Sequence, residues 1–228
     1  LDFPHLMLRY RATERKQGIK PGFGESQLTK TDRNGRLARY AAPVANWASA
    51  RGNTLTRPVL KGVANVHEDV VLPKYHSKTF VAKAAHHPVV VNDAAPAKGR
   101  KAVLYATCFV NYNNPDIGAA ARTVLARNGV ETEVIYPECC GMPQLEEGDI
   151  ANVAGRAARI AGLMAGWIKG GYDIVAMTPS CALMLKFEWP LMLPDNPQVR
   201  RLADATFDLS EYVVDIAKKE GLADGMTH

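Results

Sequence analysis

Four cysteines are the residues of this chain whose type and spacing point most clearly to chemistry. They all lie in the second half of the 228 residues, at Cys108, Cys139, Cys140 and Cys181. Thiolates are soft ligands that bind iron–sulfur clusters, zinc or cuprous ions, and paired thiols also carry out disulfide exchange. The sequence shows no secretory signal pattern, so clustered thiols here are expected to be metal ligands or redox groups rather than structural disulfides.

Each cysteine position follows a segment with the pattern of a buried β-strand. These segments are 101–107 (KAVLYAT), 130–136 (VETEVIY) and 172–178 (YDIVAMT). Cys108 follows the first, the Cys139–Cys140 pair follows the second, and Cys181 follows the third. The carboxyl ends of parallel strands lie along one edge of a sheet, so the three loops are expected to converge and bring the four thiols together.

The segments between these strands have helical patterns, and this alternation predicts the fold class. Helices are expected at 115–128, 148–169, 180–191 and 210–220, with Pro115 in the first turn of the first, Pro190 and Pro194 cutting the third, and glycines after several of their ends. Strands that alternate with helices at this spacing indicate an α/β domain with three or more parallel strands and crossover helices. We place this domain at residues 99–228.

The adjacent pair helps to separate the candidate chemistries. Neighbouring side chains of an extended chain point in opposite directions, so Cys139 and Cys140 both face one site only in a turn, which Pro137 and Gly141 permit. Two vicinal thiolates reach a single zinc ion awkwardly, whereas a cluster with several irons offers them separate targets. A zinc site, a catalytic dithiol and four merely buried thiols stay open as alternatives. Glu138 is interpreted as a solvated turn residue, with tuning of the site as its alternative.

Residues 1–98 have a different character from the α/β half. Turn signals are frequent, and helical periodicity is limited to about 4–16, 36–50 and 56–66, which predicts an irregular, mainly helical segment. Residues 1–100 contain 17 lysines and arginines against 7 acidic residues, whereas residues 101–228 contain 11 against 16. The basic residues are scattered and have few aromatic neighbours, which argues against nucleic-acid binding. A solvated basic face, or one that docks an acidic partner, is the expected interpretation.

The segment 150–168 is the longest apolar-rich helical stretch of the chain. It carries Asn152, Arg156 and Arg159, and no run of eighteen or more apolar residues exists to span a membrane. We expect it to be a crossover helix packed on the sheet. Peripheral association with a membrane is the alternative for its small-residue-rich, arginine-bearing surface.

The cysteine pattern resembles a known family. Cys108, then Cys139-Cys140-Gly141, then Cys181, in the phrases CFVNYNNPDIGAAARTVLARNGVETEVIYPECCGMPQLEEGD and MTPSCALMLK, is similar to the cysteine-rich CCG domain in the B subunit of heterodisulfide reductase. The same domain occurs in the iron–sulfur C subunit of anaerobic glycerol-3-phosphate dehydrogenase and in related lactate- and glycolate-oxidase subunits. The resemblance covers residues 101–185, and the flanking segments are similar to the glycerol-3-phosphate dehydrogenase branch.

The resemblance implies an electron-transfer role. By it, Cys108, Cys139, Cys140 and Cys181 hold an iron–sulfur cluster that takes electrons from a flavin-dependent dehydrogenase subunit oxidising glycerol 3-phosphate or a 2-hydroxy acid. The electrons pass towards quinone or another acceptor. A heterodisulfide-reductase-like thiol/disulfide enzyme and a zinc-stabilised interaction module are the two alternatives. The family commonly ends its motif in CxxC, but Met184 stands at the last position here, so four thiolates remain and favour a single [4Fe–4S] centre.

The resemblance also bears on the domain organisation and the location. Residues 1–98 are expected to follow a ferredoxin-like module that is missing from this sequence, and a second cysteine-rich domain is expected downstream. The expected location is cytoplasmic, with the inner face of the cell membrane as an alternative setting.

Overall fold

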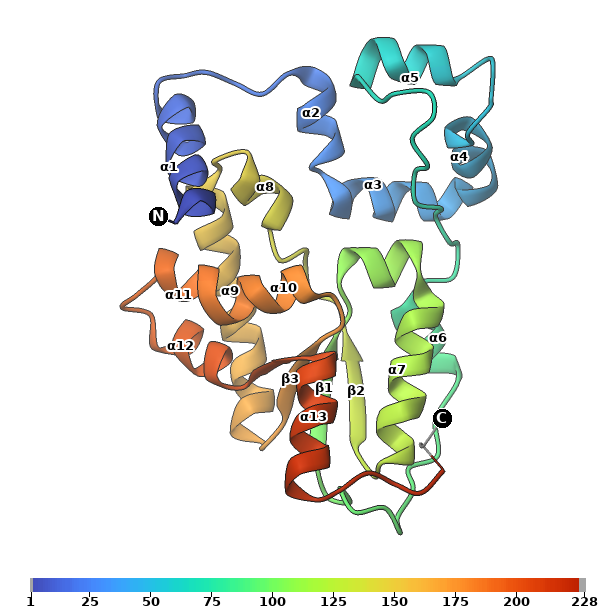
Figure 1. Ribbon diagram of the computed structural model, residues 1–228, viewed down its shortest axis with the longest axis vertical. Coiled ribbons are helices and arrows are strands. Elements are labelled where there is room, and N and C mark those ends of the chain that lie inside the picture. The colour runs from blue at the N-terminus through green and yellow to red at the C-terminus, as the bar shows by residue number, and fades with distance from the viewer. Residues whose placement is uncertain (1, 226–228) are drawn as a thin grey trace.

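A four-stranded parallel sheet forms the centre of the molecule, which is described here by a computed structural model covering residues 2–225 (Figure 1). The strands are β1 (Lys101–Tyr105), β2 (Glu131–Ile135), β3 (Asp173–Ala176) and β4 (Thr206–Asp208), in the order β2-β1-β3-β4. Every pairing is parallel. The expected α/β class is therefore confirmed, with β4 as an additional short strand.

The strand sequences explain their places in the sheet. In β1, every residue from Ala102 to Tyr105 is fully buried, as expected of a central strand covered on both faces. In β2, Glu131 and Glu133 alternate with less polar residues, which suits an edge strand with one wetter side. The burial of β1 on both faces holds this central strand firmly in place. The loops of the site extend from the carboxyl ends of β1 and its neighbours.

Helices cover both faces of the sheet and separate two apolar cores. On one face lie α9 (Ile150–Lys169) and α12 (Pro197–Asp204), whose side chains pack on Val103 and Ile174. On the other face lie α7 (Pro115–Arg127), α13 (Leu209–Lys219) and α6 (Phe80–His86), which pack on Ala102 and Leu104. The cysteines belong to the first of these cores.

The helix α9 is the segment for which membrane association is the alternative hypothesis. Its residues Val153, Ala157 and Ile160 are fully buried or nearly so in the core on the sheet. The helix α9 lies between β2 and β3 in the chain and packs on the sheet, as expected of a crossover helix. None of the helices in residues 2–225 is long and apolar enough to cross a bilayer.

The helix expected at 180–191, with Pro190 and Pro194 cutting it, is divided into three pieces in the structure. It consists of α10 (Pro179–Leu183), a π-helical stretch η3 (Met184–Glu188) and α11 (Trp189–Met192). Pro190 in the first turn of α11 lacks an amide hydrogen, which disfavours a continuous α-helical ladder. A second π-helical stretch, η2 (Phe109–Asn113), follows Cys108. Such stretches are frequent at functional sites.

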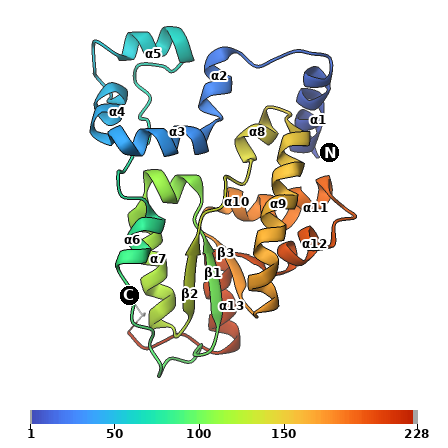
Figure 2. The same ribbon diagram turned by 180° about the vertical axis from the view of Figure 1, so that it is seen from behind.

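Short helices make up the N-terminal region, as expected, but more of them form than the periodicity indicates. They are α1 (Phe3–Lys16), α2 (Phe23–Leu28), α3 (Thr31–Ala38), η1 (Arg39–Ala41), α4 (Ala42–Ser49), α5 (Arg57–Ala64) and then α6. Figures 1 and 2 show α2 to α5 above the edge of the sheet where the strands end, and α1 beside α8 (Met142–Glu146) and α9.

Residues 28–66, which we call the basic arm, are organised by a buried arginine rather than by an apolar core. The Arg57 side chain is only 2% exposed. Its guanidinium donates to the carbonyl oxygens of Ser49, His67, Glu68 and Val70. Most large apolar side chains of the arm point to solvent.

The docking of α1 is expected to weaken as the pH rises. His5 lies between Asp2, at 2.5 Å from its Nδ1 atom, and Glu188 of η3, at 3.2 Å from its Nε2 atom. The hydrogen bond to Asp2, followed by the charge of Glu188, raises the pKa of His5. A raised pKa in the folded state stabilises the protein below the unfolded value of about 6.5, and this stabilisation is lost as the pH passes the folded value.

Hydrogen exchange of the α1 amides measures this effect. Relative to α9, protection of α1 is expected to fall as the pH rises above about 6.5, after correction for the intrinsic exchange rate. His5→Gln removes the titrating group and should remove the pH dependence. An equal pH dependence in that variant would contradict the assignment to His5.

Candidate functional site

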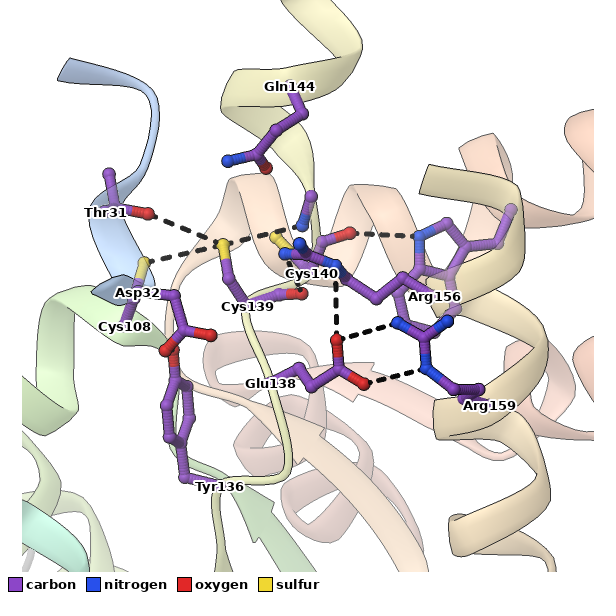
Figure 3. Close-up of polar contacts among 12 residues, drawn as sticks. Thr31, Asp32, Cys108, Tyr136, Glu138, Cys139, Cys140, Gln144, Arg156 and Arg159 are labelled. Carbon is purple, nitrogen blue, oxygen red and sulfur yellow. Dashed lines mark hydrogen bonds and ion pairs between the residues drawn. The ribbon is translucent and has the colours of Figure 1, made fainter. Parts of the chain in front are cut away.

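The four thiols lie together at the carboxyl edge of the sheet. Cys108 follows β1 at the start of η2, the Cys139–Cys140 pair follows β2, and Cys181 lies in the first turn of α10 after β3. The three loops converge because β1 pairs with both β2 and β3. Figure 3 shows the thiols of Cys108, Cys139 and Cys140 side by side. Their role as ligands stays a prediction.

The sulfur atoms form two close pairs. The Sγ atoms of Cys108 and Cys139 are 3.8 Å apart, and those of Cys140 and Cys181 are 3.2 Å apart. Cys139, Cys140 and Cys181 are buried, whereas Cys108 is partly exposed. The site therefore reaches solvent on the side of Cys108.

Hydrogen bonds concentrate negative charge on one sulfur. The hydrogen bond with Cys108, then that with Cys140, lowers the pKa of Cys139, and the Gly141 amide donates to the same sulfur at 3.5 Å. The hydrogen bond with Cys139 raises the pKa of Cys108 and of Cys140. The Gly141 amide directed at the Cys139 sulfur is the kind of donor that stabilises the sulfur ligands of a bound cluster.

Three successive carbonyl groups of the cysteine loop are each held by a side chain from a different element. Tyr105 of β1 donates its hydroxyl to the Glu138 oxygen at 2.5 Å. Arg156 of α9 donates to the Cys139 oxygen at 3.1 Å, and the indole of Trp189 donates to the Cys140 oxygen at 3.2 Å. We call these three side chains the carbonyl clamp. The clamp fixes the turn in which two adjacent cysteines face one site.

Gly141 completes this turn. Its φ of 90° lies in the left-handed region, and a Cβ there would come within 3.1 Å of the Val153 side chain. The left-handed backbone conformation therefore favours glycine, and a Cβ would also press on Val153, which explains the third letter of the Cys-Cys-Gly motif.

A family model for the CCG cysteine-rich domain matches residues 102–186, the stretch that contains all three loops. This part of the chain is a CCG domain. Curated proteins similar to this chain include a dehydrogenase subunit and lactate utilization proteins. The C subunit of anaerobic glycerol-3-phosphate dehydrogenase from Escherichia coli K12 is 26% identical over 193 residues, covering 83% of this chain and 47% of the relative.

Lactate utilization protein A of two bacilli is also similar. The Bacillus pumilus protein is 33% identical over 123 residues, covering 51% of this chain and 49% of the relative. The Bacillus licheniformis protein is 31% identical over 127 residues, covering 53% and 50%. The chain thus spans about half the length of these relatives, and no solved structure matches it.

Charged residues border the thiols of the CCG domain. Glu138 accepts two hydrogen bonds from Arg159, at 3.1 and 3.0 Å, and lies 3.4 Å from the Nε atom of Arg156. Glu138 is therefore an ion-paired residue of the site rather than a free turn residue. Arg156 joins this pair to the carbonyl clamp, as Figure 3 shows.

The N-terminal region also contributes to the site of the CCG domain. The Thr31 hydroxyl at the start of α3 lies 3.6 Å from the Cys139 sulfur. The next residue, Asp32, accepts a 2.8 Å hydrogen bond from Tyr136, and burial raises the pKa of Tyr136. No sequence signal marks Thr31 and Asp32 as site residues, because a polar pair at a helix start is ordinarily a local cap.

The donor set indicates which group fits the CCG domain. Within residues 2–225, no three histidine, cysteine or acidic side chains are placed so that they hold one metal ion. The Sγ separations of 3.8 and 3.2 Å are also compatible with thiolates around one zinc ion, which binds each sulfur at about 2.3 Å, so zinc stays the alternative. Four converging thiols with hydrogen-bond donors directed at sulfur suit an iron–sulfur cluster, which binds each cysteine at a different iron.

Proposed function

We propose that this chain holds an iron–sulfur cluster on Cys108, Cys139, Cys140 and Cys181 and relays electrons for an oxidoreductase. The observation that carries this proposal is the convergence of four thiols from three strand ends at one largely buried edge. Four thiolates match the ligand requirement of a single [4Fe–4S] centre. The names of the relatives, a dehydrogenase subunit and a lactate utilization protein, support a redox role.

The physiological direction of flow is part of the proposal. Electrons would come from a flavin-dependent dehydrogenase subunit that oxidises glycerol 3-phosphate or a 2-hydroxy acid, and would pass towards quinone or another acceptor. A bound cluster transfers one electron at a time. A flavin that has taken up two electrons from a substrate would therefore pass them to the cluster in two successive steps.

The residues of the chain have distinct parts in this mechanism. The four thiolates bind the irons, and the Gly141 amide and the Thr31 hydroxyl donate towards the Cys139 sulfur. Donors to sulfur stabilise negative charge and set the potential at which the site is reduced. The carbonyl clamp holds the loop in place, so little reorganisation accompanies each change of charge.

A thiol–disulfide enzyme is the second candidate, and the 3.2 Å separation of Cys140 and Cys181 favours it. These sulfurs are close enough to form a bond after a small shift. Both residues are buried, however, so a disulfide substrate has poor access to the thiolate that must attack it. The burial favours electron transfer, which requires no contact between substrate and sulfur.

Two assays distinguish these functions. Anaerobically prepared protein reduced with dithionite is mixed with a soluble naphthoquinone, and the visible absorbance follows reoxidation. The relay predicts quinone reduction at a rate that depends on cluster content. Turnover of a disulfide substrate by protein that lacks iron, with no quinone reduction by protein that contains iron, would establish the enzyme instead.

A further inference from the structure

The outer side of the basic arm carries an unpartnered apolar stripe. Leu37, Tyr40, Val44 and Trp47 follow one another at intervals of three, four and three residues along α3, η1 and α4, and each is 56–76% exposed. This spacing places Leu37 and Tyr40 on one face of α3 and η1, and Val44 and Trp47 on one face of α4. The neighbouring α5 adds Val59 and Val63, each more than half exposed. Large apolar side chains exposed on neighbouring helices in this number indicate an interaction site.

Basic side chains surround this stripe. Residues 28–66 contain seven lysines and arginines, and Asp32 is their one acidic residue. Asp32 is itself engaged by Tyr136. Among the described residues, no carboxylate lies within ion-pair distance of Lys30, Arg33, Arg36, Arg39 or Arg51. An apolar surface rimmed by unpaired positive charge is complementary to an acidic partner.

The position of the arm connects this surface to the cysteine site. The inner side of α3 contacts the site through Thr31 and Asp32, and Gly35 packs so closely on the Tyr112 ring that a Cβ has no room. Figures 1 and 2 show α3 directly above the edge at which the strands end. A partner on the outer side of α3 is thus about one helix diameter, roughly 10–12 Å, from the sulfur atoms.

We propose that the basic arm is the docking face for an acidic electron-carrier protein that exchanges electrons with the cysteine site. This inference rests on the proposed function, since it names the surface through which the electrons pass. In the exchange, each reduced carrier gives one electron to one oxidised cluster, and no covalent bond forms or breaks. Charge attraction brings the partner to the arm, and the apolar stripe holds it there.

The test uses the cluster-loaded chain and a reduced, acidic plant-type ferredoxin as the probe in stopped-flow mixing. The double variant R36E/R51E reverses two exposed charges of the arm. The matched control, R200E/R201E, reverses two exposed charges on α12, which lies away from the arm in Figure 1. We expect the arm variant to lower the second-order rate about tenfold or more at low salt, and the control to change it little.

Two further measurements separate the possible outcomes. Iron content and the EPR signal of each variant show whether the cluster is present, so a failure of the proposed function is visible before any rate is compared. Equal rates for the arm variant and the control, with clusters intact, would overturn the docking proposal. Equal rates, together with arm-dependent binding of the chain to vesicles of phosphatidylcholine and phosphatidylglycerol, would replace it with membrane docking.

Discussion

Replacing Cys139 or Cys181 with serine is expected to remove most of the iron from anaerobically purified protein. Each variant deletes one thiolate from a set of four, and each affected sulfur belongs to a different close pair. An alcohol at the same place is a much poorer ligand for iron than a thiolate, because its oxygen is rarely deprotonated. Iron and acid-labile sulfide are measured per chain and compared with the unmodified protein.

The control for this prediction is Met184→Leu. Met184 is fully buried near the site, and a change of methionine to leucine nearly conserves volume. This variant should keep its iron, because a thioether is not expected to bind the cluster. Circular dichroism shows whether each serine variant keeps its fold. Full iron content in well-folded C139S or C181S protein would show that the ligand assignment is wrong.

The second large effect is expected at Arg156 of the carbonyl clamp. Arg156→Gln removes the hydrogen bond to the Cys139 oxygen and one of the two cations beside Glu138. Groups that orient metal ligands typically change metal affinity about 10- to 100-fold when they are mutated. We therefore expect a chelator to remove iron from R156Q about tenfold or more faster than from the unmodified protein.

Arg159→Gln is the matched control for this experiment. Arg159 pairs with the same Glu138 carboxylate, but it is more exposed and the Cys139 carbonyl is held by Arg156. If the clamp matters, R159Q should release iron nearly as slowly as the unmodified protein. Equal acceleration in both variants would assign the effect to the charge of the arginines instead. A reduction potential measured for each variant separates these explanations further.

The sequence was sufficient to predict the sheet and the meeting of the cysteines. Three segments have strand patterns strong enough to be located, and the rule that parallel strands end at one edge places Cys108, the Cys139–Cys140 pair and Cys181 together. The fourth strand, β4, was missed, because Thr206–Asp208 is too short to show an alternating pattern.

The surroundings of the thiols could not be predicted in the same way. Tyr105 has the pattern of a core residue in a buried strand, and Trp189 that of a core or interface residue, yet each donates to a carbonyl of the cysteine loop. The partners in these two hydrogen bonds are 33 and 49 residues apart in the sequence, so the contacts depend on the tertiary fold and on the direction of each side chain. Thr31 lies 108 residues from Cys139, and no local pattern links them.

The central claim, that the CCG domain of this chain holds an iron–sulfur cluster, is tested most directly by chemical analysis and EPR of protein kept free of oxygen. If the cluster is present, iron and acid-labile sulfide occur in equal amounts, close to the content of one [4Fe–4S] centre per chain, and an EPR signal appears on one-electron reduction. Zinc at one ion per chain, with neither iron nor sulfide, would contradict this claim.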